Sequence, residues 1–383
     1  MNIEQKKWVV NDGWKTMREG NFSASPQLVF LFGGNSAVQD QTLFDEVRSW
    51  YPGAHIVSAS TAGEIAQTEV SEDALVATAI YFENTTLQFS RAHISSAEQS
   101  EEVGKQLVRD LPKEGLVHVM IFSDGLFVNG TPLVKGLLSE LPKEVSVTGG
   151  LAGDGARFQE TRVGLDALAQ TQNLVCVGFY GPHIKIGYGS LGGWDVFGVP
   201  RTITKSSGNV LYELDGKPAL SLYKEYLGDL AKDLPSSGLL FPLNLQIVSD
   251  AGVRVDVART ILSVDEEKQT MTFAGDMPEG VVAQFMKANF DRVIDGAAGA
   301  ASMSTEILGE NQVELALLVS CIGRKLVLKD RIEEETEAVQ EKLGAQVAMM
   351  GFYSYGEICP TAPTERQCQL HNQTMTITTF HEV

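Results

Sequence analysis

The feature of this sequence that most constrains its fold is an alternation of short apolar runs with segments of helical periodicity. The apolar run Gln27–Phe32 ends in Gly33-Gly34, and the apolar run Leu116–Phe122 ends in Ser123-Asp124-Gly125. Between these two runs, residues 43–50 carry apolar side chains at helical spacing. Short apolar runs that stop at small residues are typical of buried strands, and strands that alternate with helices predict a sheet covered by helices.

The rest of the chain shows the same mixture of patterns. Helical spacing predicts three further helices, over residues 220–227, 282–293 and 332–343. Alternating apolar residues predict two hairpins, over residues 74–94 and 202–214. The glycine-rich stretch Gly187–Arg201 is the best candidate for a domain boundary. We therefore expect an α/β to α+β fold with two domains, residues 1–195 and 196–383, each a mixed sheet covered by helices.

The composition disfavours several classes of partner. A formal net charge of −19 argues against nucleic acids and anionic membranes, because contact with phosphate groups requires a basic surface. No apolar run approaches the roughly 20 residues that a membrane helix requires. The four cysteines form no CxxC pair and are too few for a disulfide framework. These features predict a cytoplasmic protein.

The sequence lacks the motifs of the common catalytic sites. The segment Gly149–Gly155 is rich in glycine, but it has no GxGxxG spacing and no GKS or GKT follows it. No GxSxG elbow is present, and the six histidines show neither HxH nor HxxxH spacing. We therefore expect that the protein is not an enzyme.

Polar and aromatic residues instead gather at predicted strand ends in the last sixty residues. Three segments carry them, Ser320–Arg324, Gly351–Pro360 and Leu370–Thr374. Such side chains can orient a small polar ligand, although a buried polar network that only fixes strand register would use the same residues. The predicted pocket consists of Arg324, Tyr353, Tyr355, Glu357, His371, Asn372 and Thr374. Four residues of the first half, at strand ends of their own, are expected to face the same cleft: Ser60, Thr61, Glu64 and Asp154.

The order and spacing of these segments resemble those of the FIST family of intracellular sensory proteins. Three segments resemble parts of the FIST N domain: Ser60–Ile65 (STAGEI), Phe122–Gly125 (FSDG) and Gly149–Gly155 (GGLAGDG). Three other segments resemble parts of the FIST C domain: Ser320–Leu328 (SCIGRKLVL), Gly351–Ile358 (GFYSYGEI) and Leu370–Thr374 (LHNQT). The resemblance assigns residues 1–195 to FIST N and residues 196–383 to FIST C.

The resemblance implies a sensor that binds a small-molecule ligand and regulates a partner in trans, either a histidine kinase or a cyclic-di-GMP enzyme. Some FIST proteins without an output domain are haem-containing nitric oxide sensors, so haem b with nitric oxide is the first expectation. An amino acid or another small metabolite is the alternative ligand. A different class of function, an enzyme with Glu357 and His371 as an acid/base pair, stays open. The oligomeric state is open as well, and a homodimer is one alternative.

A b-type haem requires an axial side chain such as histidine. The first candidate is His183, because it follows Gly181-Pro182 at a stiff turn near the predicted boundary. The second candidate is His371. Four aromatic residues near His183 are expected to supply the flat apolar walls that a porphyrin requires: Tyr180, Tyr188, Trp194 and Phe197.

Overall fold

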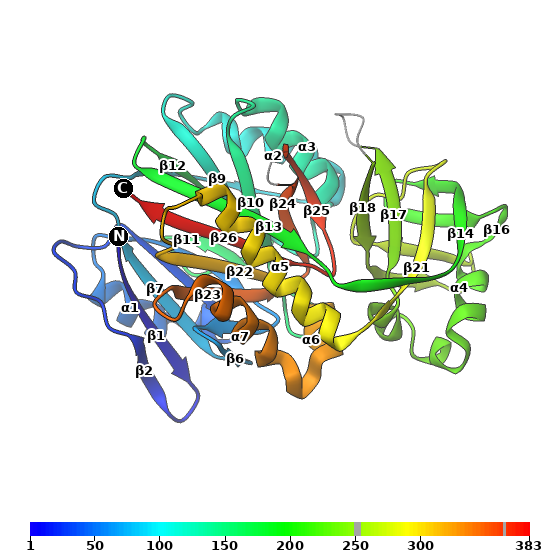
Figure 1. Ribbon diagram of the computed structural model, residues 1–383, viewed down its shortest axis with the longest axis horizontal. Helices are drawn as coiled ribbons and strands as arrows, with labels where there is room; N and C mark the ends of the chain where they lie inside the picture. The colour runs from blue at the N-terminus through cyan, green and yellow to red at the C-terminus, as the bar shows by residue number, and fades with distance from the viewer. Residues whose placement is uncertain (249–253, 363–364) are drawn as a thin grey trace.

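The computed structural model describes residues 1–248, 254–362 and 365–383 (Figure 1). They form a large body of three sheets and a small domain, residues 194–288, on one side of it. The mixed α/β class predicted from the sequence is confirmed. Within the described residues, no helix is long and apolar enough to cross a membrane.

Three six-stranded sheets make up the body. Sheet 1 has the order β11 (Val163–Leu165), β4 (His55–Ser60), β3 (Leu28–Gly33), β7 (Leu75–Tyr81), β1 (Asn2–Val9), β2 (Gly13–Arg18). Sheet 2 has the order β25 (Glu365–His371), β24 (Gly356–Ala362), β10 (Ser146–Leu151), β9 (Leu116–Ser123), β12 (Asn173–Tyr180), β8 (Thr86–His93). Sheet 3 has the order β6 (Glu69–Ser71), β5 (Glu64–Ala66), β23 (Ala348–Ser354), β22 (Leu315–Cys321), β26 (Met375–Glu382), β13 (Ile184–Leu191).

The described residues contain seven α-helices, of which α4 lies in the small domain. They are α1 (Gln41–Trp50), α2 (Ser100–Arg109), α3 (Gly130–Glu140), α4 (Ala219–Leu227), α5 (Phe290–Leu308), α6 (Ile322–Leu328) and α7 (Ile332–Leu343). Three of them begin at side-chain caps that satisfy free backbone N–H groups. Asp40 caps α1, Asn129 caps α3 and Asn289 caps α5. The helix predicted over residues 332–343 is confirmed, and Gly344 ends it as expected.

The three sheets repeat one topology. In each sheet a parallel strand pair is joined through helix, as β3–α1–β4, β9–α3–β10 and β22–α6–α7–β23. A later strand then returns antiparallel beside the first strand of the pair, as β7, β12 and β26. An earlier strand closes the unit on its outer side, as β1, β8 and β13. The body therefore consists of three structural units of the same design, which we call units 1, 2 and 3.

The units exchange strands in a cycle. The strand that follows the parallel pair of each unit joins the edge of another unit's sheet. Strand β5 of unit 1 pairs with β23 of unit 3. In the same way β24 of unit 3 pairs with β10 of unit 2, and β11 of unit 2 pairs with β4 of unit 1. Because every unit both gives and receives a strand, the units cannot separate without breaking backbone hydrogen bonds.

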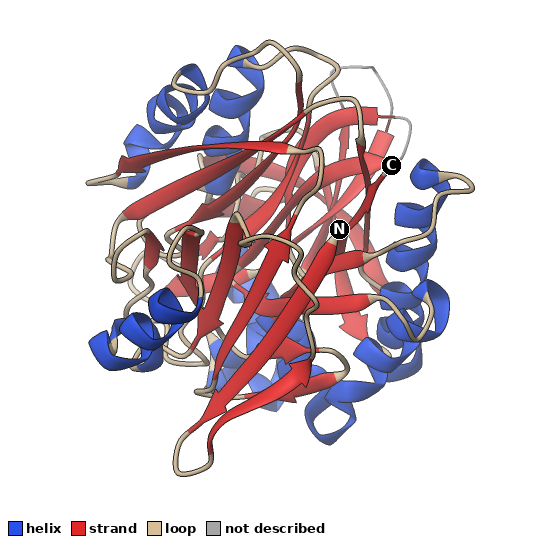
Figure 2. Cartoon of the chain, turned by 90° about the vertical axis from the view of Figure 1, so that its left-hand side faces the viewer, coloured by secondary structure: helices blue, strands red, loops and turns tan. Residues whose placement is uncertain are grey.

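The inner faces of the three sheets meet in one apolar core, and helices cover the outer faces (Figure 2). One phenylalanine from each sheet lies at the centre of this core. The ring centroids of Phe32 and Phe352 are 4.8 Å apart, and that of Phe122 is 5.6 Å from Phe32 and 6.2 Å from Phe352. All three rings are buried. Since each lies within the last three residues of its strand, their packing brings the loops that follow these strands to one end of the body.

The small domain is inserted into unit 3, between β13 and α5. Its eight-stranded sheet consists of β18 (Arg254–Arg259), β17 (Leu243–Val248), β21 (Val282–Ala288), β14 (Trp194–Ser207), β15 (Val210–Leu214), β20 (Thr270–Phe273) and β19 (Ile261–Asp265), with β16 (Lys217–Pro218) beside β15. It has its own apolar core, to which α4 contributes Tyr223. The chain enters at Gly192-Gly193 and returns at Asn289, so two short crossings join the small domain to the body.

Three features of the structure bear on the sequence-based expectations. The hairpin expected over residues 74–94 is wrong, because β7 lies in sheet 1 and β8 in sheet 2. The helix expected over residues 282–293 is also wrong. Residues 282–288 form strand β21, and α5 begins only at Phe290. The boundary expected between residues 195 and 196 lies where the small domain begins, but strands from both sides of it share sheets 2 and 3.

Candidate ligand-binding site

The loops that follow β4, β10 and β23 interlock at one end of the body. Each loop donates a backbone hydrogen bond to the strand end of another unit, which continues the cycle of exchanged strands. The bonds run from Ala62 N to Tyr353 O (2.8 Å), from Gly153 N to Ser60 O (2.9 Å) and from Tyr355 N to Leu151 O (3.2 Å). The STAGEI, GGLAGDG and GFYSYGEI segments of the sequence are therefore one cluster in space.

Two of these loops share a local motif, a hydroxyl residue followed three positions later by a buried glutamate. Thr61 donates its hydroxyl hydrogen to Glu64, and the backbone N–H of Ala74 donates to the other carboxyl oxygen over 3.0 Å. Ser354 donates to Glu357 over 2.6 Å. Burial raises the pKa of both carboxyl groups to about 8, against the lowering effect of these hydrogen bonds.

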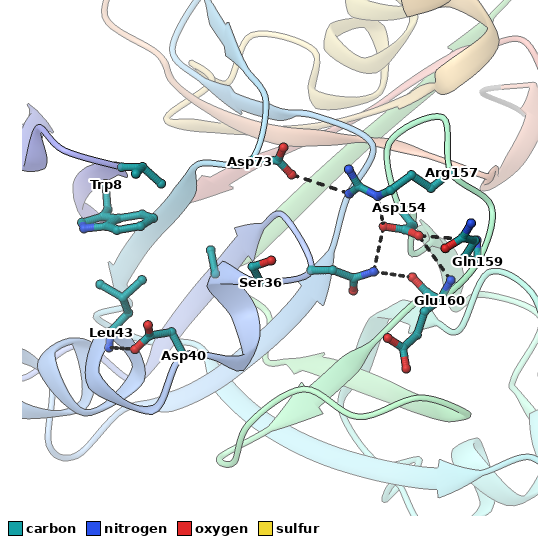
Figure 3. Close-up of a pocket in the computed structure, with 12 residues that line it drawn as sticks. Trp8, Ser36, Asp40, Leu43, Asp73, Asp154, Arg157, Gln159 and Glu160 are labelled. Carbon is teal, nitrogen blue, oxygen red and sulfur yellow. Dashed lines mark hydrogen bonds and ion pairs between the residues drawn. The ribbon is translucent and has the colours of Figure 1, made fainter.

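A surface cleft opens beside the STAGEI and GGLAGDG loops (Figure 3). Its main cavity has a volume of about 520 Å³, and a narrow recess of about 20 Å³ adjoins it and shares Asp73 and Arg157 with it. We call both together the loop cleft. The main cavity is lined by Trp8, Val10, Asn35, Ser36, Ala37, Asp40, Leu43, Asp73, Asp154, Arg157, Gln159 and Glu160, and the recess by Thr61, Ala62, Gly63, Glu64, Glu72, Asp73, Gly155, Arg157 and Lys325.

Asp154 is the centre of the hydrogen bonds in the main cavity (Figure 3). Its Oδ1 accepts from Asn35 Nδ2 and from Arg157 Nε, each over 2.8 Å. Its Oδ2 accepts from the backbone N–H groups of Gln159 and Glu160. The side chain of Asp154 is buried, whereas that of Arg157 is 46% exposed. Asp154 therefore holds Arg157 in place while leaving much of the guanidinium open to solvent.

Unit 3 contributes Lys325 to the recess. Its Nζ donates to the carbonyl oxygen of Ala62 over 2.6 Å and lies 2.6 Å from a carboxylate oxygen of Glu72. It also lies 5.8 Å from the ring centroid of Tyr353. The recess thus receives residues from all three units, because Gly155 and Arg157 come from unit 2 and Thr61 to Glu64 from unit 1.

The neighbouring residue Arg324 points into the protein and is fully buried. It forms an ion pair with buried Glu335 over 2.8 Å, and Glu335 also accepts from the hydroxyl groups of Ser320 (3.2 Å) and Tyr353 (2.5 Å). The same guanidinium donates to the carbonyl oxygen of Gly192, and over 2.6 Å to that of Val293. Gly192 lies on one crossing to the small domain and Val293 beside the other. Arg324 therefore holds both crossings in place.

The remaining predicted residues of the C-terminal half surround Glu357. The hydroxyl and backbone N–H of Thr374 donate to its carboxylate over 3.0 and 3.3 Å. His371 is the register partner of Glu357 in the β24–β25 pair, but its Nε2 lies 3.0 Å from the carbonyl oxygen of Cys359. Burial lowers the pKa of His371 to about 4. Asn372 is fully buried, and its side-chain amide has no hydrogen-bond partner within the part of the chain that the structure describes.

The structure thus divides the predicted site residues into two groups. Thr61, Glu64 and Asp154 line the loop cleft, and buried Ser60 supports it by accepting from the backbone N–H of Arg162 over 2.8 Å. Arg324, Tyr353, Glu357, His371 and Thr374 belong to buried polar networks, and Asn372 is buried beside them in the chain. None of the six lines the loop cleft. That the second group binds a ligand stays a prediction.

Tyr355 belongs to neither group and instead supports the GGLAGDG loop. Its ring stacks on Phe158 at 4.3 Å, and its hydroxyl group donates to the carbonyl oxygen of Gly155 over 3.1 Å.

Sequence reasoning missed four residues of these arrangements. Asp73 and Arg157 lie in loops without a motif, and Glu335 lies in an acidic run of α7 that reads as a solvated helix face. Lys325 had a signal, since it belongs to the SCIGRKLVL segment, but its direction depends on how α6 begins. Helix α6 starts at Ile322, immediately after β22, so Arg324 and Lys325 point to different sides.

The surroundings of the proposed axial histidines do not fit a haem. His183 is exposed at its turn, and its backbone carbonyl accepts from Val383 N. The four aromatic residues considered as porphyrin walls are dispersed. Tyr180 packs in the core between α2, α3 and sheet 2, Trp194 contacts Met286 and Val327, and Phe197 packs on the core of the small domain. Neither His183 nor His371 lines the loop cleft, so haem b stays a prediction from the resemblance.

Comparisons with known proteins identify the chain as a two-part FIST protein. The family model of the FIST N domain matches residues 27–217, and that of the FIST C domain matches residues 219–360. The chain therefore belongs to the FIST family, whose domains are sensory domains of signal transduction. The two models meet inside the small domain, so FIST C comprises most of the small domain together with much of unit 3.

Curated relatives are distant. The chain is similar to the uncharacterized protein Rv0628c of Mycobacterium tuberculosis, with 27% identity over 60% of each chain. It is also similar to the uncharacterized protein Mb0898c of Mycobacterium bovis, with 26% identity over 60% of this chain and 59% of that one. The chain thus spans about 60% of the length of these relatives. The crystal structure of a cyanuric acid hydrolase from A. caulinodans covers 94% of this chain and 90% of its own, with 9% identity and a TM-score of 0.37, too low to support an inference.

Proposed function

We propose that this FIST protein senses a small polar metabolite that carries an amino group, such as an amino acid, and binds it in the loop cleft. The observation that carries the proposal is the charge of the main cavity. Its wall holds the carboxylates of Asp40, Asp73, Asp154 and Glu160 but a single cation, Arg157. An ammonium group is attracted to such a wall, and the exposed part of the Arg157 guanidinium suits a carboxylate on the same ligand.

The position of the loop cleft supports a sensory role. Three units meet at the recess, so an occupant would contact segments that lie more than 250 residues apart in the sequence. Lys325 in the recess is next to Arg324, which holds both crossings to the small domain. A ligand that displaces or attracts Lys325 would act on α6, and α6 carries the Arg324 contact. Such a contiguous set of contacts is the kind of network through which two sites couple.

The experiment is a calorimetric titration with free amino acids, the matching amines and the matching carboxylic acids. We expect the amino acids to bind best, because only they satisfy both the acidic wall and Arg157. Asp73→Asn and Arg157→Gln should each weaken binding by about tenfold or more, the effect of losing one charge-assisted hydrogen bond. Asn suits position 73 because its backbone φ of 55° lies in the left-handed region, which Asn tolerates.

Asp229→Asn is the matched control, since its side chain is 97% exposed in the small domain and far from the loop cleft in the chain. It should leave the dissociation constant unchanged. If the two cleft variants bind the ligand as tightly as the control does, or if the carboxylic acids bind as well as the amino acids, the cleft assignment is wrong.

We further propose that the signal passes in trans to a histidine kinase or a cyclic-di-GMP enzyme. The support is the family, whose domains are sensory, and the link from the loop cleft to the small domain. The test adds the protein, with and without its ligand, to candidate enzymes and measures autophosphorylation or cyclic-di-GMP turnover. An enzyme rate that responds to the protein but not to its ligand would contradict a sensory role for the cleft.

A further inference from the structure

A second cavity lies between the body and the small domain. It has a volume of about 550 Å³ and is formed by α3 and β25 of the body together with β17, β18 and the segment around Asp276 of the small domain. Strands β25 and β18 face each other across the two parts of the molecule (Figure 1). We call it the interdomain pocket. It shares no residue with the loop cleft. Its volume falls in the range of pockets that hold small molecules.

A buried cation, Arg259, lies on the wall of this pocket. The residue is 4% exposed, and its guanidinium donates to the backbone carbonyl oxygens of Ala258, Asp276 and Leu370 over 3.1–3.2 Å. Within the described residues no carboxylate lies within 4.0 Å of it, and its Nη2 takes part in none of these bonds. Burial lowers the pKa of Arg259 to about 10. Asp276 attracts the guanidinium from beyond ion-pair distance. A buried charge without a close ion pair is costly, so an anion in contact with Arg259 would be stabilised.

The other charged residues on the wall are Asp276 and Lys135. Asp276 is the carboxylate of the pocket, and its Oδ1 accepts from Asn129 Nδ2 over 2.9 Å. Lys135 is the second cation, and its 71% exposed side chain pairs with Glu101, which is not on the wall. Because Lys135 already pairs with Glu101, the cation on the wall that lacks an ion pair among the described residues is Arg259.

The rest of the wall is largely apolar. Val134 and Leu138 follow each other at one helical turn on α3, and Ile247, Pro278 and Leu370 face the same cavity from the small domain and from β25. Hydrocarbon against these side chains would be removed from water, which favours binding by roughly 25 cal/mol per Å² of apolar surface. The pocket thus combines one buried cation with an apolar channel.

We propose that the interdomain pocket binds a small amphipathic carboxylate, with its carboxylate at the guanidinium of Arg259 and its hydrocarbon part against Val134 and Leu138. The occupant contacts both the body and the small domain. The carboxylate accepts from the guanidinium of Arg259 and supplies the close ion pair that this residue lacks among the described residues. Because the loop cleft shares no residue with this pocket, the inference does not depend on the ligand proposed for the cleft.

The test is a calorimetric titration of the full chain with decanoate, decanol and decyltrimethylammonium, all below their micelle concentrations. Decanoate should bind at least about tenfold more tightly than decanol, because only decanoate forms a charge-assisted hydrogen bond with Arg259. Decyltrimethylammonium should bind least. Equal affinities for the three probes, or no binding of decanoate at millimolar concentration, would overturn the proposal.

Two variants locate the binding. Leu138→Trp fills the pocket from α3 while leaving Arg259 in place, and it should weaken decanoate binding at least about tenfold. Arg259→Lys keeps the charge but loses the planar guanidinium, and it should remove most of the preference for decanoate over decanol. Leu230→Trp, at an exposed position elsewhere on the small domain, is the matched control for the tryptophan. Unchanged binding in Leu138→Trp would overturn the assignment.

Asp73→Asn separates this inference from the proposed function, because it alters only the loop cleft. It should bind decanoate with unchanged affinity. Loss of decanoate binding in Asp73→Asn would place the carboxylate in the loop cleft and refute the interdomain pocket.

Discussion

The ion pair between Arg324 and Glu335 gives the sharpest prediction for stability. Both side chains are fully buried, and together they connect α6, α7, β22, β23 and the two crossings to the small domain. Removing one charge leaves the other buried and uncompensated, which typically costs about 3–5 kcal/mol. We therefore expect Arg324→Met and Glu335→Leu each to lower the free energy of unfolding by about that amount.

The double variant should cost no more than either single variant. It removes both charges and leaves four polar groups without their partners: the carbonyl oxygens of Gly192 and Val293 and the hydroxyl groups of Ser320 and Tyr353. At about 1 kcal/mol for each group, the cost is roughly 4 kcal/mol. The two substitutions should therefore be strongly non-additive.

The assay is urea unfolding of the wild type, both single variants and the double variant, followed by far-ultraviolet circular dichroism. Lys224→Met and Glu266→Leu form the control cycle, since these partners lie 2.5 Å apart but are 31% and 61% exposed. An exposed pair of this kind is worth about 0–1 kcal/mol. A double variant of Arg324 and Glu335 whose cost equals the sum of the two single costs would refute the reasoning.

Three further predictions follow from the buried residues. Glu357 has a folded-state pKa of about 8, above its unfolded value of about 4.5. Its contribution to stability therefore falls as pH rises from about 4.5 to about 8, and Glu357→Gln should remove that part of the pH dependence of the urea unfolding midpoint. Gly149→Ala should lower the free energy of unfolding by more than about 3 kcal/mol, because φ is 144° and a Cβ would overlap the carbonyl oxygen of Ile121 on the neighbouring strand. In the control Gly53→Ala a Cβ meets open space, so thermal unfolding should give a stability within about 1 kcal/mol of the wild type. In absorption spectra recorded with added haemin, His183→Ala should match the wild type because His183 is exposed at a turn, and loss of a Soret band in that variant but not in His371→Ala would restore His183 as the axial ligand.

Sequence patterns predicted the local elements of the body well. The runs Gln27–Phe32 and Leu116–Phe122 became β3 and β9, and residues 43–50 became part of α1, because each apolar run is buried on both faces and each helix buries one stripe. The helix expected over residues 282–293 failed for an equally local reason. Phe285 and Met286 fit a helical spacing, but in β21 it is Ala283 and Phe285 that alternate inward, and a short apolar segment satisfies both periods.

The cycle of exchanged strands could not be predicted from the sequence. Residues 74–94 have the composition of a hairpin, yet the chain passes from sheet 1 to sheet 2 between β7 and β8. Local propensity decides whether a segment extends, whereas the partner of an extended segment depends on tertiary packing. The same limit applies to the site, since the sequence showed that Lys325 and Arg324 are charged but not that Lys325 lines the loop cleft while Arg324 is fully buried.

The repeated topology explains why residues so far apart in the chain form one cluster. In units 1 and 3 the parallel strand pair ends in a hydroxyl residue and a glutamate, Thr61 with Glu64 and Ser354 with Glu357, and the hydroxyl group donates to the carboxyl group in both. Unit 2 has Ala152 and Gly155 after β10 and lacks this pair. The corresponding loop of unit 2 instead contributes the half-exposed Arg157 to the loop cleft, and buried Asp154 holds that guanidinium there. The guanidinium proposed to bind the ligand therefore comes from the unit whose loop departs from the shared pattern.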